Sequence, residues 1–101
     1  MARARTERRK QARQAVKDAT ERLRLAELLP GGSPSRPIRV ATSHLVELEA
    51  TTPPCVACGG SVRCDAHEVE WHGGGSLRVA RVRCVDCRVR RNVYFEVAIV
   101  S

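Results

Sequence analysis

The chain has 101 residues, 43% of them hydrophobic, and 18 basic against 11 acidic side chains give a formal net charge of +7. With one Phe, one Trp and one Tyr, a domain of this size buries too little apolar surface to be stable without a further constraint such as a bound metal. The charge favours polyanionic partners such as nucleic acid. The chain opens without an apolar segment, so we expect no secretion signal, no membrane span and a cytoplasmic, reducing environment.

Residues 1–30 are expected to form a basic amphipathic segment that is helical over 6–29, with Thr6 as its N-cap. Pro30 and the two glycines after it end the helix. Apolar residues recur in this segment at alternating steps of four and three, which is typical of a helix with a narrow packing face. We call this set the helix seam, and it comprises Ala12, Val16, Ala19, Leu23 and Ala26.

The basic side chains of this helix are concentrated in its first half. One interpretation is an arm that contacts nucleic-acid phosphates, and the other is a solvated helix face. Insertion into a membrane is not expected, because the basic part has no Trp, Phe or Leu. The candidate phosphate-binding residues of the helix are Arg5, Arg8, Arg9, Lys10 and Arg13.

Residues 31–37 are rich in Gly, Ser and Pro and are predicted to be a linker. Residues 38–52 are predicted to supply short strands that lead into the next domain. One strand is expected over 38–41. Residues 44–49 are expected to form a second strand or a brief helical turn, and the strand is favoured because Val46, Leu48 and Ala50 alternate with glutamates.

Two Cys-x-x-Cys pairs dominate residues 53–101. Cys55 and Cys58 form the first pair, and Cys84 and Cys87 form the second. Two residues between cysteines allow a tight turn to direct both sulfurs at one ion, and Zn²⁺ takes four such ligands tetrahedrally. Disulfide pairing is the alternative, which a reducing compartment disfavours. The pattern therefore predicts a Cys₄ zinc site.

The residues between and after the pairs predict three antiparallel strands. A hairpin is expected from strands over 61–71 and 76–84, joined by a glycine turn after His72. In the last strand, alternation predicts two faces. One face carries Val89, Val93, Phe95, Val97 and Ile99, and the other carries Arg90, Asn92, Tyr94 and Glu96.

At the first pair, Pro54-Cys55-Val56-Ala57-Cys58-Gly59-Gly60 resembles the Cys-Pro-x-Cys-Gly knuckle of zinc-ribbon proteins. Two residues depart from that pattern: Val56 replaces the usual proline, and Arg88 stands where the second knuckle often has glycine. The resemblance covers residues 53–100 and implies a mainly antiparallel zinc ribbon. With the helix expected before it, the predicted fold class is small α+β. The resemblance also implies a bound Zn²⁺ and does not define an activity.

Other polar residues have a functional and a structural interpretation. Cys64 is either a reactive thiol or substitute ligand, or a small apolar filler. The histidines, His44, His67 and His72, are metal ligands only if a thiolate is displaced. Carboxylates at Asp65, Glu68 and Glu70 are expected to pair with arginines across the hairpin rather than to catalyse a reaction.

Arginines near the second knuckle extend the candidate nucleic-acid surface. They are Arg81, Arg83, Arg88, Arg90 and Arg91, with Trp71 or Tyr94 available for base stacking. The leading hypothesis is thus a structural zinc module that binds nucleic acid or a nucleoprotein such as a ribosome or transcription complex. The alternative is a protein–protein adaptor, or a homo-oligomer formed through the helix seam and a ribbon edge. An enzyme is not expected, because no nucleophile–base pair or phosphate-binding glycine loop is visible.

Overall fold

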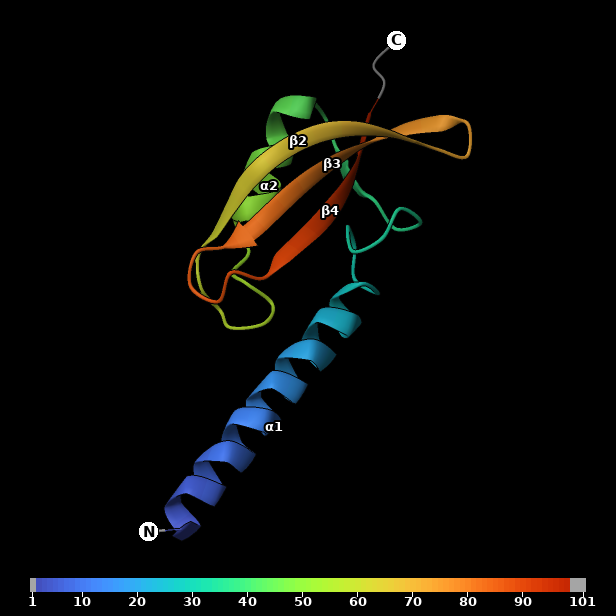
Figure 1. Ribbon diagram of the computed structural model, residues 1–101. Helices are drawn as coiled ribbons and strands as arrows, with labels where there is room; N and C mark the ends of the chain where they lie inside the picture. Colours follow the sequence, from blue (N-terminus) through green and yellow to red (C-terminus); the bar gives the residue numbers. More distant parts are fainter. Residues whose placement is uncertain (1, 99–101) are drawn as a thin grey trace.

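A four-stranded mixed sheet forms the body of the protein, and a long helix projects from one end of it (Figure 1). The computed structural model describes residues 2–98. This small α+β architecture is the predicted fold class. In chain order the elements are α1 (Ala2–Ala26), β1 (Ile38–Val40), the 3-10 turn η1 (Ser43–Leu45), α2 (Val46–Thr51), β2 (Val62–His72), β3 (Gly75–Cys84) and β4 (Arg90–Val97).

The β2–β3 hairpin forms where the sequence predicted it, with three of its four boundaries shifted by one residue and the end at Cys84 unchanged. Val62 pairs with Cys84 at one end and His72 with Gly75 at the other. The turn requires two glycines, because Gly73 and Gly74 have φ angles of 57° and 86°, which side chains with a Cβ rarely adopt. This hairpin fixes Cys84 at the end of the sheet where β2 begins.

The edge of the sheet differs from the predicted three-stranded ribbon. β1 pairs in parallel with β4, placing Ile38 opposite Phe95 and Val40 opposite Val97, so the strand order is β1-β4-β3-β2. The short strand predicted over 38–41 therefore exists, but it joins the ribbon as a fourth strand. On β4, Val93 and Phe95 are buried as predicted, whereas Ile99 lies outside the described residues.

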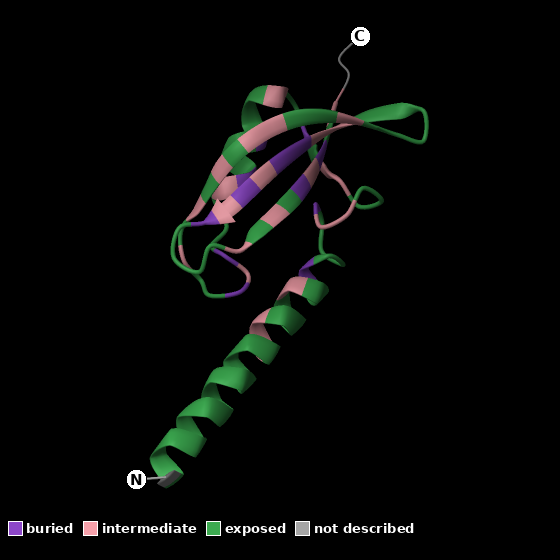
Figure 2. Ribbon diagram, in the orientation of Figure 1, coloured by how far each residue is buried: buried purple, intermediate pink, exposed green. Residues whose placement is uncertain are grey.

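The hydrophobic core lies between one face of the sheet and α2 (Figure 2). Ala80 and Val82 of β3 point into it, as does the fully buried Phe95 of β4. The strand favoured over 44–49 is wrong, because this segment forms η1 and α2, as in the helical alternative. Val46 and Ala50, four residues apart, both face the core, whereas Leu48 between them is 61% exposed. Burial follows the helical period rather than the alternation.

The Gly/Ser/Pro segment is an ordered corner that joins α1 to the sheet. The Tyr94 amide donates to the Gly31 carbonyl over 2.8 Å, and the Arg36 guanidinium donates to the Leu28 carbonyl over 2.9 Å. Gly31 has a φ of 82°, and a Cβ there would lie 2.7 Å from Cδ1 of Ile38. The glycine is therefore needed for close packing of this corner against the sheet edge.

Helix α1 is longer at its start than predicted and shorter at its end. It begins at Ala2, so Thr6 lies inside the helix and is not its N-cap; the preceding Ala and Arg residues are good helix formers. After Ala26 the backbone continues with tighter bonds, such as Leu29 N–H to the Ala26 carbonyl over 3.2 Å. Residues 3–17 are all exposed, and the molecule is 68 Å long because this part of the helix extends away from the sheet (Figure 2).

Candidate metal centre

Four cysteines from two loops meet at the end of the sheet nearest α1. Cys55 and Cys58 lie in the loop between α2 and β2, Cys84 is the last residue of β3, and Cys87 lies in the turn before β4. Their four Sγ atoms all lie within 4.8 Å of one another. The two Cys-x-x-Cys pairs, 25 residues apart in the sequence, thus form one cluster.

The sulfur spacing fits a tetrahedral metal ion. The Sγ atoms of Cys55 and Cys87 are 3.7 Å apart, and those of Cys58 and Cys84 are 3.4 Å apart. A tetrahedron with metal–sulfur bonds of about 2.3 Å has sulfur–sulfur edges of about 3.8 Å. A disulfide would require about 2.05 Å, and all five cysteines are free thiols. The cluster is therefore arranged as a site for a metal ion.

The two knuckles share one backbone geometry. In the first, Gly59 N–H donates to the Cys55 carbonyl and Cys55 N–H donates to the Gly60 carbonyl, both over 2.8 Å. In the second, Arg88 and Cys84 make the equivalent bonds, at 3.1 Å to the Cys84 carbonyl and 3.0 Å to the Val89 carbonyl. Arg88 has a φ of 62°, close to the 79° of Gly59. The second turn thus keeps the knuckle geometry with arginine in the left-handed position.

This left-handed arginine predicts a stabilising substitution. An L-residue other than glycine costs roughly 1–2 kcal/mol in this conformation, and glycine loses about 0.5–1 kcal/mol more backbone entropy on folding. Arg88→Gly is therefore expected to raise the free energy of unfolding by up to about 1 kcal/mol. Thermal unfolding of the metal-loaded chain measures it, with Arg90→Gly in strand β4 as the matched control that lowers stability. A melting temperature for Arg88→Gly below that of the parent would contradict the strain argument.

Backbone amides around the second knuckle polarise its sulfurs. The N–H groups of Cys87 and Asp86 point at Sγ of Cys84, at 3.5 Å and 3.4 Å, and lower the pKa of Cys84 to about 6 although burial opposes them. The N–H of Val89 favours the thiolate of Cys87, but burial and the neighbouring sulfurs outweigh it and raise the pKa of Cys87 to about 12. One thiolate forms readily while the next is opposed by its neighbours, and a bound divalent cation relieves this repulsion.

The end of α1 packs directly on the first knuckle. Ala19 and Leu23 contact the small buried cluster of Cys55, Ala57 and Cys84. The Arg22 guanidinium donates to the Ala57 carbonyl over 3.1 Å. The C-terminal half of the helix seam therefore docks on the metal site, while Ala12 and Val16 in its N-terminal half are exposed. Composition alone gave no signal for this docking.

The remaining cysteine and the histidines lie outside the four-sulfur cluster in residues 2–98. Cys64 packs at the edge of the core, its thiol donates to the Ala66 carbonyl over 3.2 Å, and burial raises its pKa, all consistent with an apolar filler. His67 lies beside α2 with Nδ1 3.8 Å from a Glu47 oxygen, and its buried Nε2 has no partner. His72 Nε2 lies 3.3 Å from a Glu70 oxygen, and His44 is exposed in η1.

Two arginines of β3 are engaged in ion pairs within the protein. Arg83 pairs with Asp65 at 3.0 Å, and Arg81 pairs with Glu68 at 3.0 Å and with Glu70 at 3.4 Å. These are the predicted cross-hairpin ion pairs.

The other residues of the candidate nucleic-acid surface do not gather at one place. Arg88 and Arg90 are exposed beside the second knuckle, whereas Arg91 is partly buried on the core face of the sheet. Trp71 is 77% exposed and lies near the hairpin turn, at the opposite end of β2 from the cysteines. The sheet therefore presents no joint stacking and phosphate surface built from Trp71 and these arginines.

Comparison of the chain with protein-family models, with curated proteins and with solved structures gave no match. Among the described residues, no helix is both long enough and apolar enough to cross a membrane. The metal cluster and the distribution of charge are therefore the features of the chain that bear on its function.

Proposed function

We propose that this protein is a structural zinc module of the zinc-ribbon type that presents a cationic helix to the phosphate backbone of a nucleic acid. The observation that carries the proposal is the exposed part of α1. Residues 3–17 are all exposed and hold seven basic side chains against one acidic side chain, Glu7. The remainder of the chain is nearly balanced, with eleven basic and ten acidic residues.

The proposed metal is Zn²⁺, and its proposed role is structural. Four thiolates in tetrahedral spacing suit Zn²⁺, and four protein ligands leave no open position for a substrate or an activated water. The metal joins the loop after α2 to the end of β3, and α1 packs on that loop. In this proposal the ion stabilises the loop on which the C-terminal part of α1 packs, and the protein is a binding module rather than an enzyme.

The arrangement of charge along α1 supports binding to phosphates. Arg9, Arg13 and Lys17 follow one another at steps of four and so lie along one face of the helix. Lys10 adjoins the same face. One arginine guanidinium can donate two parallel hydrogen bonds to a phosphate. A row of arginines along a rigid helix can therefore follow a nucleic-acid backbone. By contrast, Arg81 and Arg83 of the sheet already have carboxylate partners.

Deletion of residues 2–17 tests this proposal. The shortened chain keeps Ala19, Arg22 and Leu23, which contact the metal site, but loses the seven basic side chains of residues 3–17. We expect it to bind zinc and to lose nearly all affinity for fluorescently labelled duplex DNA and single-stranded RNA, measured by anisotropy at low and physiological salt. Equal affinity of the full and shortened chains would contradict a phosphate-binding helix.

Binding to a protein partner or to a second copy through the helix seam is the second candidate. Val16 is 67% exposed in the N-terminal half of the seam, and Leu25 and Leu28 are 58% and 61% exposed near the C-terminal end of α1. Analytical ultracentrifugation of the same full chain separates the two candidates. A stable dimer that Val16→Glu converts to monomer, together with no affinity for nucleic acid, would make self-association the better explanation.

A further inference from the structure

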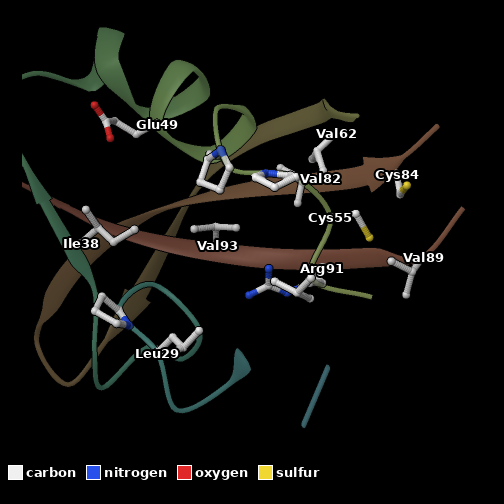
Figure 3. Close-up of a pocket in the computed structure, with 15 residues that line it drawn as sticks. Leu29, Ile38, Glu49, Cys55, Val62, Val82, Cys84, Val89, Arg91 and Val93 are labelled. Carbon is white, nitrogen blue, oxygen red and sulfur yellow. The ribbon is translucent and has the colours of Figure 1, made fainter. Parts of the chain in front are cut away.

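An apolar cavity of about 170 Å³ lies beside the metal centre and takes no part in the function proposed above. Its floor is the core face of the sheet, with Val62 from β2, Val82 from β3 and Val93 from β4 (Figure 3). The end of α2, the loop before Cys55 and the segment after α1 form its walls. Cavities of about 150 Å³ hold a benzene-sized group, so this one has room for a phenyl ring or a branched aliphatic group.

One cationic group enters this otherwise apolar lining. Arg91 is partly buried in β4, and its guanidinium lies at the cavity between Val93 and the Cys55 loop (Figure 3). The Arg91 guanidinium makes no hydrogen bond or ion pair with any residue in 2–98, whereas the guanidinium groups of Arg81 and Arg83 each pair with carboxylates. Burial lowers the pKa of Arg91, with the charges of Cys55 and Glu27 opposing, and a guanidinium nevertheless stays protonated.

A partly buried guanidinium that makes no direct hydrogen bond is costly. The nearby charges of Cys55 and Glu27 offset part of that cost. An anion that bonds directly to the guanidinium recovers the lost hydrogen bonds. The other charged side chain at the cavity is Glu49, which is exposed at the end of α2 (Figure 3). An anion is therefore favoured at the Arg91 side, and an apolar body is favoured between Val62, Val82 and Val93.

We propose that this cavity is a binding site for a monocarboxylate with a single ring-sized apolar body, whose carboxylate pairs with Arg91. Such a group occurs in a free aryl or branched-chain acid and also at the C-terminal residue of a peptide. Both sources share the chemistry that the cavity recognises, and the ligands tested below distinguish them. The site requires neither the cations of α1 nor a nucleic acid.

Titration of the zinc-loaded full chain with acid and amide pairs tests the site by amide and methyl NMR shifts. The probes are phenylacetate against phenylacetamide, and N-acetyl-phenylalanine against its amide. We expect an acid to bind at least about tenfold more tightly than its amide, with shifts at Val62, Val82 and Val93. Tighter binding of phenylacetate indicates a free acid, and tighter binding of N-acetyl-phenylalanine indicates a peptide end. Equal binding of acid and amide, or binding of neither acid, overturns the proposal.

Two variants and a matched control assign the interaction. Arg91→Gln is expected to weaken acid binding at least about tenfold and to leave amide binding unchanged, whereas Arg90→Gln removes the same charge from the neighbouring exposed position without effect. Ala50→Leu fills the cavity from α2 and is expected to abolish binding while zinc content and melting temperature are maintained. If zinc-loaded Arg91→Gln binds phenylacetate as the parent does, Arg91 serves only to offset the charge of the metal centre and the proposal fails.

Discussion

Cys58→Ser is expected to abolish stoichiometric zinc binding and to unfold the sheet at room temperature. Structural zinc contributes roughly 10–16 kcal/mol in small domains, which matches or exceeds the roughly 5–15 kcal/mol by which whole domains are stable. The core that remains is small: Phe95 is its only buried aromatic residue among 2–98, and its other members are Val and Ala. Metal content by native mass spectrometry and the dispersion of amide NMR signals measure the two effects.

Cys64→Ser is the matched control for this experiment. The substitution has the same chemistry, but the Cys64 sulfur lies outside the four-sulfur cluster and at the edge of the core. We expect one zinc per chain to be retained and a loss of about 1 kcal/mol, because a serine hydroxyl can keep the bond to the Ala66 carbonyl. A Cys58→Ser chain that stays folded with one zinc bound, or a Cys64→Ser chain that loses it, would contradict the assignment of the ligands.

Loss of the metal is also expected to release α1 from the sheet. Ala19 and Leu23 pack on the cluster of Cys55, Ala57 and Cys84, and Arg22 bonds to the Ala57 carbonyl, so these contacts all lie at the metal site. Residues 3–17 of α1 are all exposed, so this part of the helix lacks the tertiary packing that normally stabilises a helix of marginal intrinsic stability. Chelation should therefore lower the helix signal in circular dichroism beyond the contribution of α2.

The elements that the sequence predicted well are those specified by local chemistry. The Cys-x-x-Cys spacing placed four sulfurs at one point, and three consecutive glycines after His72 located the hairpin turn. Alternation along β4 placed Val93 and Phe95 on one apolar face, and both are buried. Within each Cys-x-x-Cys pair, turn and strand, residues a few positions apart determine the geometry, and the β2–β3 hairpin then brings the two pairs together.

The features that the sequence did not predict depend on contacts between distant segments. Val46, Leu48 and Ala50 fit a strand as well as a helix, and only packing of Val46 and Ala50 on the sheet selects α2. The parallel pairing of β1 with β4 depends on the Gly31 corner, which composition marked merely as a linker. The cavity at Arg91 is lined by residues from α2, both knuckles and the chain beside this corner, so no local sequence pattern predicts it.

Binding to duplex DNA is expected to weaken about a hundredfold between 50 and 200 mM salt. Arg9, Lys10, Arg13 and Lys17 lie within one side of α1, and four phosphate contacts give a slope of about −3.6 for log K against log salt. Replacing Arg9 and Arg13 by Gln should reduce the slope by about 2, since each lost contact releases about one counterion fewer. Replacing Arg81 and Arg83 by Gln is the matched control and should leave the slope unchanged, because carboxylates already neutralise them. Equal reductions from both pairs would move the binding surface from the helix to the sheet.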